Sequence, residues 1–169
     1  VRAVAEELGV PRDEALASLI KFTGTKRRFE RKGSFDGAVI VDDYAHHPTE
    51  VRATLSAARK FPHNRIWCVF QPHTYSRTKS LLDDFAQALS LADRILVADI
   101  YAAREADEGL IHARDLVGRI GEYGHDALYM PSFCEIVEHL AHNTQPGDLI
   151  LTMGAGDISR IGEMLIARG

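Results

Sequence analysis

Cysteine is scarce in this sequence. The 169 residues include two cysteines, Cys68 and Cys134, and no CxxC pair. Two isolated thiols supply neither a cysteine-rich zinc site nor the disulfide framework of a small secreted domain. We therefore expect two buried, reduced thiols, Cys68 in a strand and Cys134 in a helix.

Long apolar segments are also missing. The chain has no uninterrupted apolar run of about 18 residues, which a membrane-spanning helix would need, and no signal-like apolar segment. Membrane spanning and secretion are therefore disfavoured, and we expect a cytoplasmic protein. Basic residues are not in excess, with 20 Lys and Arg against 24 Asp and Glu. Binding of nucleic acid through a basic face is not favoured either.

Several catalytic signatures are absent. The sequence has no GxxxxGK[ST] loop to cradle the phosphates of ATP,. It has no HExxH pair and no Cys/His quartet, which zinc sites use,. Ser76 lacks the GxSxG turn of an activated serine, and Cys68 is expected to be inaccessible in mid-strand. Nucleophilic catalysis by either residue is not favoured.

What the sequence does contain is an alternation of strand and helix from residue 33 onward. With 46% hydrophobic residues, the chain can build an ordinary core,. Short β-branched runs predict strands, and apolar residues at helical spacing predict helices. The predicted strands are residues 39–41, 65–70, 94–98, 127–130 and 149–152, and the predicted helices are residues 48–58, 80–91, 113–123, 131–140 and 158–167. This order predicts an α/β domain with a mostly parallel sheet and helices on both faces.

The first part of the chain differs. Residues 1–8 and 11–20 have helical spacing but no strand to pack on, so we interpret them as the tail of a preceding domain. A chain that starts at Val1 with a helix under way suggests a fragment of a longer protein. Residues 26–30 are interpreted as an extended basic connector, and we favour a solvated linker over an anion contact.

Four predicted strands end in polar segments: residues 42–47, 71–77, 99–105 and 154–157. The remaining predicted strand is followed by Pro131 and Ser132 and has no comparable polar segment at its end. In a parallel sheet the carboxyl ends of the strands share one edge, where ligands of open α/β sheets bind. We therefore expect a functional site at this edge.

Two chemistries compete for that edge. A metal site would use Asp42, Asp43, His46, His47 and His73. Consecutive residues in an extended segment point to opposite sides, so the two adjacent histidines do not both face one ion. We therefore disfavour a metal and expect at least one of these histidines to hydrogen-bond backbone and cap a helix.

Recognition of an anion fits better. His73, Arg77 and Arg104 are donors at two strand ends, and a guanidinium grips a carboxylate with two parallel hydrogen bonds. Asp42 or Asp43 is suited to accept a hydrogen bond from a ribose hydroxyl or a substrate amine. The turn at residues 154–156 is a weaker candidate, because two glycines before a helix usually serve a tight corner.

Four segments, residues 22–30, 42–50, 70–78 and 99–105, resemble the motifs of the Mur ligases in sequence and in order. The resemblance covers the chain from about Phe22 to its end. It implies a three-domain enzyme: a UDP-sugar domain, a central ATPase with the phosphate loop, and a Rossmann-like C-terminal domain. On this resemblance, residues 1–32 are the last helices of the central domain plus the hinge, and residues 33–169 are the C-terminal domain.

The resemblance also implies an activity. The motifs are most similar to those of members that use ATP to join L-alanine to UDP-N-acetylmuramate through an acyl phosphate. Mg²⁺ and the ATP phosphates would be held mainly by the central domain, so this chain would need the upstream domains of the same polypeptide as partners and would be inactive alone. Other hypotheses stay open: a recycling ligase that attaches a preformed tripeptide, a metallohydrolase, and a non-catalytic binding module.

Site residues follow from the motif positions. The resemblance assigns Arg28 and Asp43 to the nucleotide. It assigns a second group to the substrate and amino-acid end: Tyr44, His46, His73 and Arg77. Many relatives carry arginine where this chain has Thr74, so a two-arginine clamp is in question. Arg104 is our hypothesis for a replacement.

Overall fold

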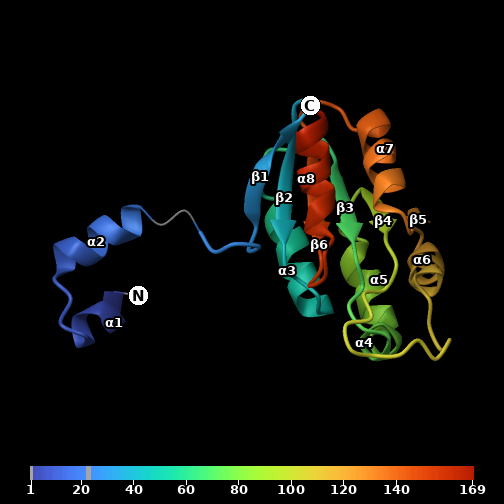
Figure 1. Ribbon diagram of the computed structural model, residues 1–169, viewed down its shortest axis with the longest axis horizontal. Helices are drawn as coiled ribbons and strands as arrows, with labels where there is room; N and C mark the ends of the chain where they lie inside the picture. Colours follow the sequence, from blue (N-terminus) through green and yellow to red (C-terminus); the bar gives the residue numbers. More distant parts are fainter. Residues whose placement is uncertain (1, 22–23) are drawn as a thin grey trace.

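The computed structural model describes residues 2–21 and 24–169. Within the second range lies a six-stranded sheet with the strand order β1-β2-β6-β3-β4-β5 (Figure 1). Its strands are β1 (Glu30–Phe35), β2 (Ala38–Asp43), β3 (Ile66–Phe70), β4 (Arg94–Val97), β5 (Ala127–Tyr129) and β6 (Leu149–Met153). All pairings among strands β2, β6, β3, β4 and β5 are parallel, and β1 pairs with β2 antiparallel. The predicted mostly parallel α/β sheet is confirmed.

Helices cover both faces of the sheet (Figure 1). The helices of the α/β body are α3 (Pro48–Ala58), α4 (Tyr75–Ser80), α5 (Leu82–Leu89), α6 (Ala113–Glu122), α7 (Phe133–Asn143) and α8 (Ser159–Arg168). Helices α3, α5 and α6 pack on one face, where Cys68 and Phe70 of β3 are buried. Helices α7 and α8 pack on the other, against Trp67 and Val69. The alternation of side chains along β3 therefore supplies both cores.

Strand β1 was not predicted. Its sequence, ERKGSF, has no alternating apolar pattern, because an antiparallel edge strand needs few buried side chains,. The pairing with β2 shifts register between Arg31 and Gly33. A Cβ at Gly33 would lie 3.0 Å from Cδ1 of Ile166, so glycine here lets α8 approach the edge strand.

Three other expectations were wrong in detail. The helix predicted at residues 80–91 is two helices, with α4 beginning at Tyr75 and a break at Leu81. The helix predicted from Pro131 begins at Phe133, because the Ser132 hydroxyl caps it. Cys134 is exposed rather than buried, since it lies in an open groove between α7 and α8 beside Met164. Cys68 is buried as expected, and burial raises the pKa of its thiol to about 12.

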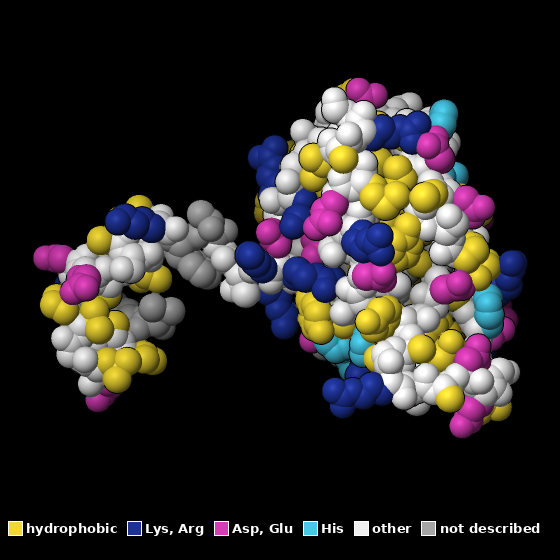
Figure 2. Space-filling model, in the orientation of Figure 1, with side chains coloured by type: hydrophobic (Ala, Val, Ile, Leu, Met, Phe, Trp, Pro, Cys, Tyr) yellow, Lys and Arg dark blue, Asp and Glu magenta, His cyan; other side chains and the backbone are white. Residues whose placement is uncertain are grey.

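The two predicted N-terminal helices are present as α1 (Arg2–Glu7) and α2 (Arg12–Ile20). Val1, Phe22 and Thr23, which belong to the first predicted helix and the first motif, lie outside the described residues. The two helices pack on each other and lie apart from the α/β body (Figures 1 and 2). Their apolar side chains stay uncovered, with Leu8 74% and Ile20 86% exposed. None of the helices in residues 2–21 and 24–169 has the length and apolar character that crossing a bilayer requires.

Candidate functional site

The four polar segments do meet at one edge of the sheet. Strands β2, β6, β3 and β4 are consecutive in the sheet and parallel. Their last residues are level, because Met153 pairs with both Asp43 and Phe70. This confirms that the polar strand exits share an edge, and it places them around the centre of the sheet.

Arg27 fastens the segment that precedes β1 to the polar edge of the sheet. Its Nε donates to Oδ2 of the buried Asp42 at 2.9 Å, and its Nη2 and Nη1 donate to the carbonyl oxygens of Gly154 and Gly156 at 2.6 and 3.1 Å. Its guanidinium also lies 4.8 Å from the ring centroid of Tyr44. The prediction of an extended, solvated connector was therefore wrong here. Residues 26–29 fold back as turns over the end of β2.

The two aspartates at the end of β2 both make structural hydrogen bonds. Asp42 accepts from Arg27 and, at 2.8 Å, from the Thr152 hydroxyl of β6. Asp43 accepts from the backbone N–H groups of Phe29 and Ala45, each at 2.8 Å. These bonds fix the path by which the chain leaves the strand and the position of the hinge segment above it.

The glycines after β6 allow two strand exits to approach closely. Gly154 has a φ of 150°, and a Cβ there would lie 2.7 Å from the Gln71 carbonyl oxygen. A Cβ at Gly156 would lie 2.2 Å from Oε1 of Gln71. The carbonyl oxygens of both glycines accept from Arg27. The turn thus packs the edge together, as the tight-corner interpretation expects.

Four aromatic side chains form a continuous row across three strand exits, which we call the imidazole row. The ring centroids of Tyr44 and His46 are 5.3 Å apart, those of His46 and His73 are 5.7 Å apart, and His73 stacks on Tyr101 at 5.7 Å. The row therefore joins the ends of β2, β3 and β4. Tyr101 was not among the predicted site residues, although it lies inside the fourth motif.

Arg77 extends from α4 to this row. Its Nη1 lies 3.2 Å from Nδ1 of His73, which accepts only when that nitrogen carries no proton,. Burial, the Arg77 charge and His46 lower the pKa of His73, and Glu105 opposes them. The imidazole is therefore neutral at pH 7, and Arg77 is the cation at this point of the edge.

His47 has a structural role. Its Nδ1 accepts from the backbone N–H of Thr49 and caps α3, while Glu50 accepts from the backbone N–H groups of His46 and His47. This confirms that at least one of the two adjacent histidines caps a helix. Among the residues that the structure describes, no three His, Cys, Asp or Glu side chains are grouped so as to hold a metal.

Thr74 has an unusual backbone conformation. Its φ of 66° is rare for a β-branched residue and stores strain,. Its N–H donates to the Tyr101 carbonyl at 2.9 Å, and its carbonyl accepts from the Thr78 hydroxyl at 2.7 Å. The strained turn directs His73 and Arg77 toward the same side. In residues 24–169, the exposed side chains of Arg28 and Arg104 make no hydrogen bond or ion pair.

The contact between His73 and Arg77 gives a testable prediction. Arg77→Ala removes a nearby positive charge, so the pKa of His73, which now lies below its ordinary value of 6.5, should rise toward that value,. NMR titration of the histidine ring protons would measure this rise, with Lys79→Ala on the exposed side of α4 as the control. Because folding lowers this pKa, the stability that it contributes is present above pH 6.5 and is lost as the pH falls,. An unchanged pKa in Arg77→Ala would contradict the contact.

Comparison with known proteins connects this geometry to a family. The family model described as Mur ligase, glutamate ligase domain, matches residues 27–156. A curated protein of Caldanaerobacter subterraneus, named UDP-N-acetylmuramate–L-alanine ligase, is 53% identical over 97% of this chain. A protein of the same name from Lachnospira eligens is 52% identical over 97% of the chain. The chain spans 36% of the length of each of these relatives.

Solved structures agree with the sequence relatives. UDP-N-acetylmuramate–alanine ligase from Thermotoga maritima matches with a TM-score of 0.79 and 27% identity over 98% of this chain and 35% of its own. A murein peptide ligase from Psychrobacter arcticus matches with a TM-score of 0.69 and 28% identity over 98% of this chain and 34% of its own. With the family model covering most of the α/β body, these matches show that the chain belongs to the Mur ligase family.

Proposed function

We propose that this chain is the C-terminal domain of a cytoplasmic ATP-dependent ligase that joins L-alanine to UDP-N-acetylmuramate in peptidoglycan synthesis. Support comes from the curated relatives of that name, which are 52–53% identical over nearly the whole chain. The structural observation that carries the proposal is the combination of the imidazole row with Arg77 at one polar edge of the sheet. Such an edge is suited to bind a small carboxylate beside a reacting group.

The chemistry assigns a task to these residues. ATP activates the muramoyl carboxyl group as an acyl phosphate; the neutral amine of L-alanine attacks its carbonyl carbon, and the C–O bond to phosphate breaks. The acceptor must be held by its carboxylate while its amine stays free. Arg77 has one nitrogen on His73 and others available for a carboxylate,. We assign Tyr44, His46 and His73 to the walls of this subsite, and Arg104 to a second cationic contact.

ATP and Mg²⁺ are proposed to bind mainly to the upstream ATPase domain. This sequence has no phosphate loop, and the described residues contain no group of three or more His, Cys, Asp or Glu side chains placed to hold a metal. Asp42 is buried under Arg27 and Thr152, so it is not available to a metal. Arg28, whose side chain is exposed, and Asp43, whose carboxylate oxygens keep further lone pairs, are assigned to the nucleotide,.

The domain boundary is part of the proposal. We assign residues 1–32 to the end of the central domain and the hinge, and residues 33–169 to the C-terminal domain. The uncovered apolar side chains of α1 and α2 support this assignment, because such surfaces are normally buried against a neighbouring domain,. The contacts of Arg27 would then hold the hinge in a defined position over the sheet while the domains close around the acyl phosphate,.

Reconstitution tests this proposal. The chain joined to upstream UDP-sugar and ATPase domains should release ADP when supplied with ATP, Mg²⁺, UDP-N-acetylmuramate and L-alanine. The 169-residue chain alone should release none above background, because it lacks the phosphate loop,. ADP release by the isolated chain would contradict the proposed division of labour.

A recycling ligase is the second candidate. The likeness of the chain to the structure of a murein peptide ligase is the observation that supports it. The two candidates differ in the acceptor that attacks the acyl phosphate. Competition between L-alanine and the tripeptide for the same enzyme separates them, because the favoured acceptor suppresses transfer to the other.

A further inference from the structure

We infer that Glu105 is a positioning residue: it holds the first turn of α4 so that Arg77 faces the carboxylate of the acceptor. This inference rests on the proposed function, because it assigns Arg77 to the acceptor. Helix α4 has only six residues, and its N-cap residue Thr74 makes no side-chain cap. The N–H groups of its first turn therefore need another acceptor.

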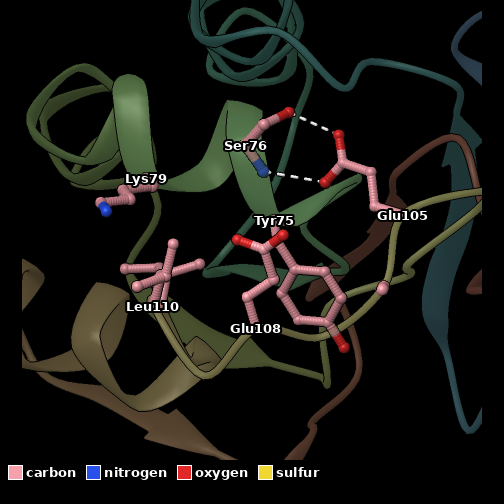
Figure 3. A pocket seen from close by; sticks show the side chains of 8 residues that line it. Tyr75, Ser76, Lys79, Glu105, Glu108 and Leu110 are labelled. Atoms are coloured by element: carbon pink, nitrogen blue, oxygen red, sulfur yellow. Dashed lines mark hydrogen bonds between the residues drawn. The ribbon is translucent and has the colours of Figure 1, made fainter.

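Glu105 supplies that acceptor from the loop between β4 and α6. Its Oε2 accepts from the backbone N–H of Ser76 at 2.9 Å, and its Oε1 accepts from the Ser76 hydroxyl at 2.5 Å (Figure 3). The bonds from Ser76 are the largest cause of a lowered pKa of Glu105, so the side chain is ionised at pH 7. The backbone N–H of Tyr75 and the Thr74 side chain contribute to the lowered pKa as well, so this carboxylate serves the start of α4, directly before Arg77.

A cavity of about 230 Å³ flanks these bonds. Tyr75, Lys79, Glu108 and Leu110 line it around the Ser76–Glu105 pair (Figure 3). Because the space is open rather than filled by apolar side chains, the polar bonds of Glu105 join the loop to the helix at this point. Without them, packing at this place would do little to keep the first turn of α4 in position.

The position of this turn matters because it is strained. Thr74, at φ 66°, precedes the helix, and the bond between its N–H and the Tyr101 carbonyl is a second link between α4 and the same loop. The Tyr101 N–H also donates to the Pro72 carbonyl at 2.8 Å, so these backbone bonds hold the residues before α4. Releasing Ser76 removes the hold on the first turn of the helix itself. Relaxation would move Arg77 away from Nδ1 of His73, now at 3.2 Å, and would weaken the grip on a carboxylate without touching the nucleotide,.

The test compares Glu105→Ala with Glu108→Ala in the enzyme that carries the upstream domains. Glu108 lines the same cavity, and in the described part of the chain it makes no hydrogen bond or ion pair. Glu105→Ala should raise the KM for L-alanine by roughly fivefold, with kcat and the KM for ATP changed by less than about twofold, because acceptor binding alone is weakened. The KM for L-alanine of Glu105→Gln should lie between those of the wild type and Glu105→Ala. The KM of Glu108→Ala should match that of the wild type.

Amide hydrogen exchange on the same proteins gives a readout independent of turnover. The amides of α4 should exchange faster in Glu105→Ala than in Glu108→Ala, with the other helices unchanged. An active wild type whose KM for L-alanine and α4 exchange are unaffected by Glu105→Ala would overturn the inference alone. A fall in kcat together with an equally large rise in the KM for ATP would also overturn it, because such changes indicate general structural damage. A wild type with no turnover that depends on L-alanine would overturn the proposed function, and the inference with it.

Discussion

Arg27→Ala is expected to lower the free energy of unfolding by about 3 kcal/mol, because it leaves a buried carboxylate without its charged partner. The side chain of Asp42 is 1% exposed and that of Arg27 is 26% exposed, so this pair is shielded from water far better than a surface ion pair,. The substitution also removes two hydrogen bonds to the carbonyl oxygens of Gly154 and Gly156. For a chain of this size the melting temperature should fall by about 6–12 °C.

The neighbouring residue is a matched control for this prediction. Arg28 carries the same charge next to Arg27 in sequence, but its side chain is exposed and, in the described residues, makes no hydrogen bond or ion pair. Arg28→Ala should therefore change the free energy of unfolding by less than about 0.5 kcal/mol. Asp42→Asn should restore part of the stability lost in Arg27→Ala, since the buried charge is then gone. Equal melting temperatures for Arg27→Ala and Arg28→Ala would show that Arg27 is a solvated linker residue after all.

Arg77→Ala should raise the KM for L-alanine about 10- to 100-fold in the enzyme with its upstream domains, because a charged hydrogen-bonding partner of the carboxylate is lost. Arg77→Lys should recover only part of this loss, since an ammonium lacks the fork of parallel donors. The KM for ATP should change little, because we assign the nucleotide to other residues. Steady-state kinetics with L-alanine and ATP varied in turn measures all three effects.

Lys79→Ala is the control for Arg77. Lys79 lies on the same short helix with an exposed side chain that, within residues 24–169, has no partner. Its removal should leave the KM for L-alanine within about twofold of the wild type, since a solvated side chain contributes little. A KM that is unchanged in Arg77→Ala, or raised equally in both variants, would remove Arg77 from the acceptor subsite.

The core of the fold could be predicted from the sequence because its strands are short apolar runs. Residues 66–70 of β3 and 149–153 of β6 are buried along their whole length, so hydrophobicity alone indicates them,. Strand β1 and helix α4 escaped prediction for the opposite reason. The segments ERKGSF and YSRTKS have no apolar stripe, and tertiary contacts decide their conformation.

The candidate site was predicted in part for a related physical reason. Parallel strands bring their carboxyl ends to one edge, so the segments that contain Tyr44, His46 and His73 could be grouped from the sequence, and the family resemblance singled out these three residues within them. The contacts of Arg27 to Asp42 and Gly154 span 15 and 127 residues along the chain, and no local pattern reports them. Glu105 was missed likewise, because its partner Ser76 lies 29 residues away.

The preference for the acceptor tests the central claim most directly. The chain joined to its upstream domains would be assayed for ADP release with UDP-N-acetylmuramate and, separately, L-alanine, glycine, L-serine and the tripeptide. We predict that L-alanine gives the highest kcat/KM. Release with the tripeptide alone would make the protein a recycling ligase. If none of the four acceptors supports ADP release, ligase activity is contradicted, and a metallohydrolase or a non-catalytic binding module comes back into consideration.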